Sequence, residues 1–209
     1  MLTGTQHTDQ HRSLQLIFPT VVERYALSEA ETVNRDLEQS IKALSDRTPN
    51  GRLDGYSCDI YTTYGVEERL YDYPEFMRIT DWMVSCFAAY AHRMSYATSP
   101  QGIRLTQCWV NIYQRGFAHE IHTHPNNILS GVYYVKAPPG CSEIIFHAPQ
   151  AFSSMRADCR NDSGLNQLSH AIQPKEGEMI IFNSAIKHNV PPSEIDDETN
   201  RTDADMKLL

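Results

Sequence analysis

The sequence predicts two helices in the N-terminal half of the chain and an antiparallel, all-β sandwich or barrel in the C-terminal half. Before residue 97, apolar residues recur at helical spacing. After the turn-forming stretch 99–102, short apolar runs alternate with Gly, Pro and Asn, a pattern typical of antiparallel strands. The chain has 209 residues, a length typical of one domain. We therefore expect a single domain over residues 1–209, in which a helical part over 14–100 supports a β-rich core over 101–209.

The N-terminal half is expected to contain one strand and two helices. The apolar, β-branched run 16–22 predicts a strand, and Ser28 with Glu31 predicts a capping box at the start of the first helix. The second helix is expected over residues 75–96. The expected buried stripes comprise Ala30, Val33, Leu37, Ile41 and Leu44 on the first helix, and Phe76, Ile79, Met83, Phe87, Tyr90 and Met94 on the second.

The C-terminal half is expected to contain short strands at 105–113, 130–135, 143–146 and 178–182. A Pro- and Gly-containing turn at 174–178 leads into the last of these runs.

The composition excludes several classes of function. The formal net charge of −8 argues against nonspecific binding to nucleic acid or to an anionic membrane, because both require a surplus of Lys and Arg. No apolar run approaches the roughly 20 residues of a membrane span. The polar N-terminus lacks the apolar stretch of a secretory signal. The five cysteines are odd in number and lack CxxC spacing, which indicates reduced thiols, so we expect a cytoplasmic protein.

Histidines gather in one segment of the β-rich half. Side chains of an extended segment alternate between two faces, so Glu120, His122 and His124 are expected on one face and His119 on the other. Two imidazoles at this spacing can converge on one metal ion, and imidazole is a common ligand of iron, zinc and copper. His188 follows the last predicted strand, and a barrel can bring it beside the pair. The sequence therefore predicts a metal site.

Several motifs follow one another between residues 109 and 201. They read Trp109-Val110-Asn111, His122-Thr123-His124-Pro125, Ser130-Gly131-Val132-Tyr133-Tyr134, the turn and strand at 174–184, and His188-Asn189-Val190 followed by Arg201. In this order they resemble the 2OG-Fe(II) oxygenase family, within the Fe(II)/2-oxoglutarate-dependent dioxygenase superfamily. Phe18-Pro19-Thr20-Val21 also resembles the family's N-terminus, so the resemblance spans nearly the whole chain.

The resemblance implies a mainly β fold with flanking α-helices, whose core is a double-stranded β-helix (a cupin-like jelly roll) packed by the N-terminal helices. It implies that His122, His124 and His188 hold Fe(II), with 2-oxoglutarate and O2 at the remaining positions on the metal. It also implies that Arg201 binds the far carboxylate of 2-oxoglutarate, because a guanidinium suits bidentate capture of a carboxylate. The residues that the resemblance places near the cofactor pocket are Trp109, Asn111, Tyr113, Ser130 and Tyr133.

Two departures from the superfamily leave alternatives open. The usual second ligand is Asp or Glu, whereas His124 stands here. Glu120 on the same strand face, or Asn126 two residues beyond His124, are its rivals for the third ligand position. The superfamily's final strand is apolar, whereas residues 201–206 are polar, so Arg201 is expected in a loop.

We expect an oxygenase that hydroxylates a peptide or a small molecule. A cupin-like metal enzyme that does not use 2-oxoglutarate and a non-catalytic β-domain are the alternatives. Segments 52–73 and 147–172 are expected to build the substrate pocket, and His147 and His170 are expected to lie away from the metal. The sequence indicates neither the primary substrate nor the oligomeric state.

Overall fold

The computed structural model describes residues 13–54, 56–97, 102–149, 158–161, 163–196 and 200–208. Its helices are α1 (Ala30–Arg47), η1 (Leu70–Asp72) and α2 (Pro74–Arg93). Its strands are β1 (Val22–Ala26), β2 (Tyr61–Thr62), β3 (Leu105–Tyr113), β4 (His119–His122), β5 (Leu129–Lys136), β6 (Ile144–His147), β7 (Ser169–Ile172), β8 (Glu178–Asn183), β9 (His188–Val190) and β10 (Arg201–Leu208).

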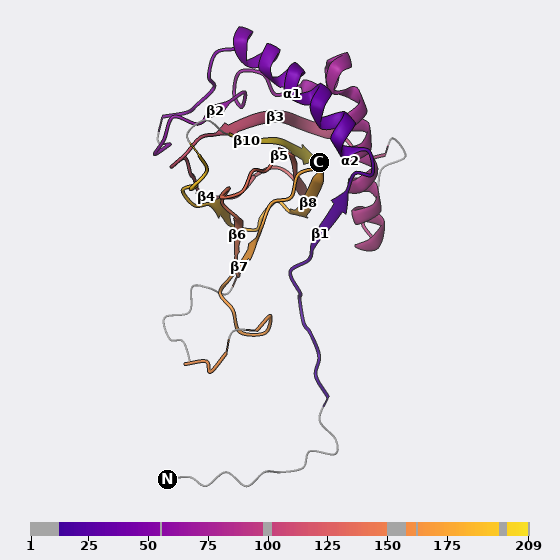
Figure 1. Cartoon of the computed structure of the whole chain (residues 1–209). Helices are drawn as coiled ribbons and strands as arrows, with labels where there is room; N and C mark the ends of the chain where they lie inside the picture. The colour runs from indigo at the N-terminus through magenta and orange to yellow at the C-terminus, as the bar shows by residue number, and fades with distance from the viewer. Residues whose placement is uncertain are drawn as a thin grey trace.

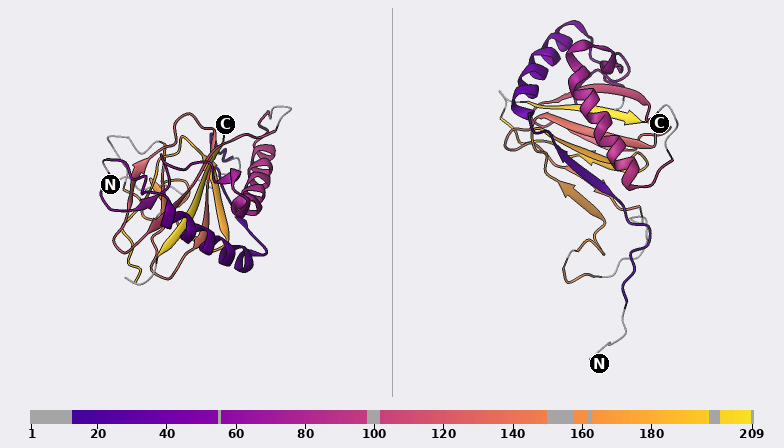
Figure 2. Two further views of the ribbon diagram at one scale, coloured as in Figure 1. Left: turned by 90° about the horizontal axis from the view of Figure 1, so that it is seen from above. Right: turned by 90° about the vertical axis from the view of Figure 1, so that its right-hand side faces the viewer.

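The strands form two antiparallel sheets that lie on top of each other. The larger sheet has the order β1-β8-β5-β10-β3-β2, and the smaller has the order β4-β9-β6-β7. Helices α1 and α2 cover the outer face of the larger sheet, whereas β4, β6 and β7 lie across its inner face (Figures 1 and 2). The larger sheet is therefore buried on both faces, as the centre of three layers.

Each face of the larger sheet contributes to its own core. On β5, Tyr133 and Val135 pack with the helices, whereas Val132 and Tyr134 pack with the smaller sheet. Phe146 of β6 belongs to this inter-sheet cluster. The alternation of a strand thus assigns each side chain either to the helix layer or to the space between the sheets, where the candidate site lies.

Gly131 explains why helix α2 approaches the larger sheet so closely. A Cβ at this position would lie 2.3 Å from Met179 Cε and 2.8 Å from Phe87 Cζ. Both distances are shorter than any ordinary carbon contact, so a larger residue here would require the ends of the Met179 and Phe87 side chains to shift.

The predicted N-terminal elements are partly confirmed. The stripe of Val33, Leu37, Ile41 and Leu44 is buried on α1, although Ala30 is only half-buried. The capping box is wrong: α1 begins after Glu29, with no side-chain cap, and the entry is instead held by a bond from the Leu27 amide to the Gly177 carbonyl (2.9 Å). Helix α2 covers most of the predicted span but ends at Arg93.

The strand predicted at 16–22 lies further along the chain, at β1. Its partner β8 ends at Asn183, and the pairing ends at Val22 opposite Phe182. The residues before β1 therefore have no strand beside them; Leu16, Ile17 and Phe18 are exposed, and the segment extends away from the body (Figure 1).

The polar C-terminal segment is a central strand and not a loop. β10 pairs with β3 on one side and β5 on the other. Its alternate residues Arg201, Asp203 and Asp205 are buried and find polar partners inside the molecule. The prediction of a loop at Arg201 was wrong because a strand need not be apolar where its inward side chains are paired.

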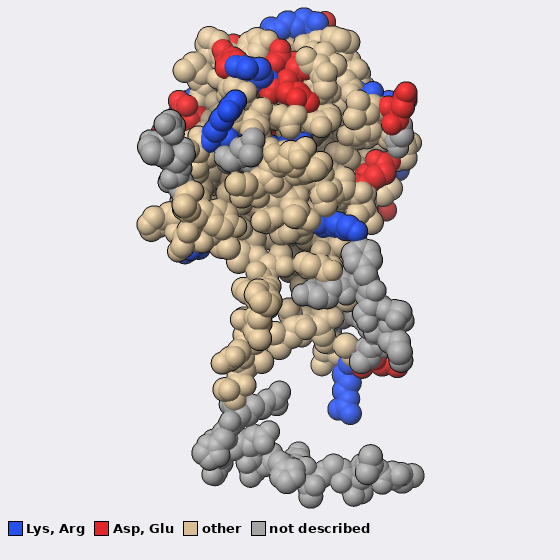
Figure 3. Space-filling view, turned by 180° about the vertical axis from the view of Figure 1, so that it is seen from behind, with Lys and Arg blue, Asp and Glu red and all other residues tan. Residues whose placement is uncertain are grey.

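Among the described residues, no helix is both long and apolar enough to cross a membrane. On the face shown in Figure 3, basic and acidic side chains are interspersed over a largely uncharged surface.

Candidate metal centre and cofactor pocket

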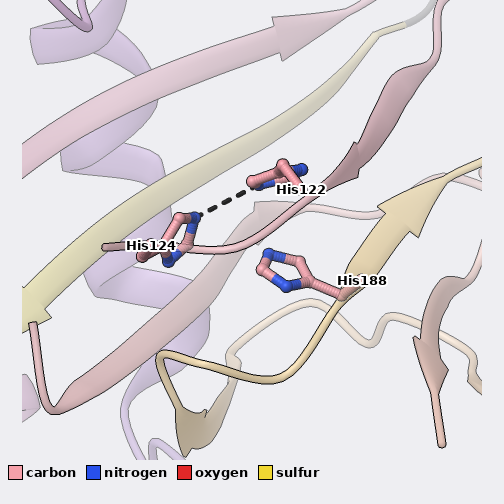
Figure 4. A group of neighbouring side chains, drawn as sticks. All are labelled: His122, His124 and His188. Atoms are coloured by element: carbon pink, nitrogen blue, oxygen red, sulfur yellow. Dashed lines mark hydrogen bonds between the residues drawn. The ribbon is translucent and has the colours of Figure 1, made fainter. Parts of the chain in front are cut away.

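Three histidines from the ends of two neighbouring strands converge between the two sheets. His122 ends β4, His124 follows it, and His188 begins β9, directly opposite His122 in the β4–β9 pairing. Their imidazole nitrogens all lie within 4.8 Å of one another. Figure 4 shows the three rings facing a common point. The predicted triad is therefore brought together by the fold.

The free nitrogens point inward because the other nitrogen of each ring is held by the protein. His122 Nδ1 donates to the Glu120 carbonyl (2.7 Å), and His188 Nδ1 donates to the Ile186 carbonyl (2.9 Å). A carbonyl can only accept, so Nε2 of both neutral rings carries a lone pair. Bonds of this kind from the second ring nitrogen are usual for metal-binding histidines.

His124 is held by a chain of two serine hydroxyls. Its Nδ1 lies 2.6 Å from Ser130 Oγ, which lies 2.7 Å from Ser184 Oγ. Its Nε2 lies 3.2 Å from His122 Nε2. Two imidazole nitrogens bound at right angles to one metal lie about 3 Å apart, given metal–nitrogen bonds of about 2.1 Å. The spacing therefore fits adjacent positions on a single ion, and His124 rather than Glu120 completes the group.

All of the clustered histidines are held in the neutral form that binds metals. Burial, followed by the nearby His122, lowers the pKa of His188 to about 3. Burial and His188 lower the pKa of His124 far below its ordinary value. Burial also lowers the pKa of His122, although the Glu120 carbonyl partly opposes it. Neutral nitrogens facing one another are the electrostatic condition for a cation site.

His119 lies inside the site, contrary to the prediction from strict alternation. The β4–β9 register shifts between His119 and His122, so both rings face the interior and stack at 4.2 Å between centroids. Tyr113 Oη lies 3.3 Å from His119 Nδ1. A β-bulge changes the facing of a side chain without leaving a signal in the amino-acid sequence.

The other ligand candidates lie elsewhere. The Glu120 carboxylate is exposed and accepts a hydrogen bond from the Ser57 amide (2.7 Å). Asn126 is exposed in the turn after His124, with a φ of 64°. His147 shares a hydrogen bond with Asn189, and the exposed His170 shares one with Gln167.

The inward face of β10 carries a buried ion pair. Arg201 is 1% exposed and donates through Nε and Nη2 to the two Asp203 oxygens (3.0 and 2.7 Å). Its Nη1 donates to the Ser142 carbonyl (2.8 Å), and its guanidinium lies 4.8 Å from the ring centroid of Tyr113 and 5.1 Å from that of Tyr134. Burial is the largest influence and opposes this charge, but Asp203, Tyr134 and Tyr113 together outweigh it and raise the pKa of Arg201.

Asp205 is the second buried carboxyl of this face. It accepts a hydrogen bond from Asn111 Nδ2. Burial, followed by the nearby Asp203, raises the pKa of Asp205 to about 8.

Four of the five residues expected near the cofactor lie on the interior side. Asn111 and Tyr113 line β3 opposite β10, Ser130 holds His124, and the Trp109 ring lies 6.1 Å from His124. Whether they contact a cofactor stays a prediction. Tyr133 was assigned wrongly: it points to the helix layer, where its hydroxyl donates to Asn34 Oδ1 of α1 (2.6 Å).

Tyr134, one residue further along β5, is the tyrosine that faces the interior. Its hydroxyl is buried and has no hydrogen-bond partner among the described residues. The choice between the two tyrosines could not be made from the sequence, because β5 is buried on both faces.

Comparisons with known proteins agree with this geometry. Residues 107–202 match the model of a family described as "Putative 2OG-Fe(II) oxygenase". No curated protein matches the chain.

Three solved structures share the fold. A Pseudomonas putida prolyl-4-hydroxylase is 12% identical, with a TM-score of 0.60 over 90% of this chain and 92% of that chain. A Trichoplax adhaerens prolyl hydroxylase in complex with a hypoxia inducible factor peptide is 14% identical, with a TM-score of 0.61 over 90% of this chain and 83% of that chain. HygX from Streptomyces hygroscopicus, with nickel, 2-oxoglutarate and hygromycin B bound, is 10% identical, with a TM-score of 0.61 over 91% and 83%. The two facing sheets are thus the double-stranded β-helix that the sequence predicted.

Proposed function

We propose that the chain is a member of the 2OG-Fe(II) oxygenase family, on the match over residues 107–202 and on its fold, and that its own residues serve the reaction as follows. The protein is an Fe(II)- and 2-oxoglutarate-dependent dioxygenase, in which His122, His124 and His188 hold the iron. The observation that carries this assignment is the convergence of three neutral imidazoles whose outer nitrogens are already bonded to Glu120, Ser130 and Ile186.

The described residues fit a ferrous ion with open positions. Three ligands on one side of an ion leave the opposite side free for other ligands, as in the facial site of non-haem iron oxygenases. When bound, iron and 2-oxoglutarate supply the activation of O2, which amino-acid side chains do not supply. The protein's part is to hold the imidazoles in one tautomer and to exclude water through the surrounding aromatic rings of Trp109, Phe146 and Phe182.

We assign the far carboxylate of 2-oxoglutarate to the Arg201 end of the pocket. A guanidinium has five N–H donors, of which Asp203 and Ser142 accept three, so two remain. The Tyr134 ring lies beside this guanidinium, and its buried hydroxyl has no hydrogen-bond partner among the described residues, which is costly unless a ligand or water accepts a hydrogen bond from it. A carboxylate at this position would satisfy both residues.

The primary substrate is oxidised at the side of the metal that the three histidines leave open. The similar structures include one with a bound peptide and one with bound hygromycin B, so they do not distinguish a peptide from a small molecule. Cys58, Cys86, Cys108 and Cys141 form no disulfide, which supports a reducing, cytoplasmic location for this chain.

Anaerobic titration tests the proposal. Fe(II) and then 2-oxoglutarate are added to the metal-free protein, and a visible charge-transfer band is expected when the 2-oxo acid chelates the iron. Iron binding without a band would refute 2-oxoglutarate dependence and favour a cupin-like metal enzyme. Failure to bind iron would refute both enzyme assignments.

Two variants distinguish a metal ligand from a residue that binds 2-oxoglutarate. His188→Ala is expected to abolish iron binding, whereas Arg201→Ala is expected to retain iron and to require more 2-oxoglutarate for the same band. Glu120→Gln is the matched control, since its carboxylate bonds to Ser57 outside the site. Unchanged 2-oxoglutarate affinity in Arg201→Ala would remove that residue from the pocket.

A further inference from the structure

Lys207 is a second buried cation of the pocket, at the opposite end of β10 from Arg201. It is 5% exposed, and its neighbours across the sheet are Gln107 on β3 and Ser130 on β5. Ser130 is the residue that holds His124. Six residues of extended chain separate the two cations by about 20 Å along the strand. Lys207 therefore lies at the end of β10 beside His124.

The Lys207 ammonium and the metal centre share one aromatic neighbour. The centroid of the Trp109 ring lies 4.6 Å from Lys207 Nζ and 6.1 Å from the centroid of the His124 ring. Figure 4 shows β10 passing behind the histidine cluster. The ammonium thus belongs to the same pocket as the candidate iron site.

The Lys207 ammonium has no anionic partner in the described part of the chain. It lies 4.6 Å from the ring centroid of Trp109 and 4.8 Å from that of Tyr64, while the buried ion pair of β10 joins Arg201 to Asp203. Burial lowers the pKa of Lys207, although Asp205 and then Glu68 oppose this effect from a distance. Aromatic faces stabilise a cation only in part, so a buried ammonium of this kind favours a bound anion.

The cofactor does not supply that anion. 2-Oxoglutarate has two carboxylates, one beside its 2-oxo group and one at the far end. In the proposed function the first binds the metal and the second binds Arg201 and Tyr134, so neither remains for Lys207. The missing anion therefore belongs to another ligand of the same pocket.

We propose that Lys207, framed by Tyr64 and Trp109, binds a carboxylate of the primary substrate and positions that substrate beside the metal. This inference rests on the proposed function and adds the substrate class to it. The single charge of the ammonium matches the single charge of a carboxylate. Tyr64 belongs to segment 52–73, which the sequence predicted as part of the substrate pocket.

Trp109 provides a direct reporter, because its ring lies against the ammonium. The protein has two tryptophans, so Trp82→Phe leaves Trp109 as the only source of tryptophan emission. The Trp82→Phe protein, loaded with Fe(II) and 2-oxoglutarate without O2, is titrated with N-acetylglycine and with its neutral counterpart N-acetylglycinamide. A saturable change in Trp109 emission is expected with the carboxylate at concentrations that have no effect as the amide.

Substitution then assigns the site to Lys207. Lys207→Met is expected to weaken N-acetylglycine binding at least about tenfold, the loss typical of one charge-assisted hydrogen bond. Lys207→Arg is expected to restore most of it. Circular dichroism of each variant checks the fold, and the charge-transfer band with 2-oxoglutarate is measured in parallel.

The outcomes separate this inference from the proposed function. Equal response to acid and amide, no saturable response to either, or an unchanged affinity in Lys207→Met overturns the substrate carboxylate while leaving the iron and 2-oxoglutarate assignment intact. A Lys207→Met protein that folds and binds iron but needs more 2-oxoglutarate for its band also overturns it, because Lys207 would then hold the cofactor. Absence of the band in the unsubstituted protein refutes the proposed function itself.

Discussion

Removing the charge of Asp203 is expected to destabilise the protein more than an ordinary substitution. In Asp203→Asn the side chain keeps its shape, but the amide group presents N–H donors where Arg201 Nη2 now finds an acceptor at 2.7 Å. Both side chains of the pair are 2% exposed, so water cannot replace the lost carboxylate. Removing one partner of a buried ion pair costs about 3–5 kcal/mol. The free energy of unfolding should fall by that amount, as measured by urea denaturation.

The double variant Arg201→Met, Asp203→Leu tests the reasoning, because it removes both charges and fills the space with apolar groups. Such replacements are often close to neutral in stability. The double variant is therefore expected to be more stable than Asp203→Asn alone. If Asp203→Asn lowers the free energy of unfolding by less than about 1 kcal/mol, a value usual for exposed ion pairs, the claim that a buried ion pair stabilises β10 would be refuted.

Three further predictions concern packing, pH and the metal. Gly131→Ala forces a Cβ against Met179 and Phe87 and should lower the free energy of unfolding by about 1–3 kcal/mol. Gly164→Ala, with open space around it, should lower it far less. Equal losses of unfolding free energy in the two variants, measured by urea denaturation, would contradict the packing argument. Because burial raises the pKa of Asp205 from 3.8 to about 8, the folded form favours its proton, and stability should decline as pH rises from about 4 to 8. The stability of the Asp205→Asn protein, measured by urea denaturation, should decline less over that pH range, and a decline parallel to that of the unsubstituted protein would be inconsistent with the raised pKa. Ser130→Ala should weaken iron binding about 10–100-fold, because His124 loses the hydroxyl that orients it; an iron affinity equal to that of a Ser40→Ala control would show that this hydroxyl does not orient the ligand.

The sequence predicted the elements whose one face is apolar. The buried stripe of α1 was recognisable because burial on one side leaves a period that can be read from the residues, whereas β3 was recognisable as a short apolar run after turn-forming residues. His122 was recognisable by its two-residue spacing to His124, and His188 by its place after the strand predicted at 178–182.

The features that the sequence did not predict have physical reasons. The inward face of β10 consists of Arg201, Asp203, Asp205 and Lys207. The burial of its charged groups depends on partners from β3 and from the β5–β6 connection, both far away along the chain. A search for apolar runs cannot find such a strand.

His119 and the two tyrosines of β5 were missed for a different reason. A register shift moved His119 to the interior, and a strand buried on both faces gives no indication of which side chains face which layer. These are properties of pairing, which is settled only when the strands meet.

X-ray absorption of the Fe(II)-loaded protein, kept free of O2, tests the metal centre most directly. The account predicts the scattering of three imidazoles per iron in the unsubstituted protein and in Glu120→Gln, and two in His124→Ala. Two imidazoles with a carboxylate in the unsubstituted protein, unchanged in His124→Ala, would contradict the assignment of the three histidines.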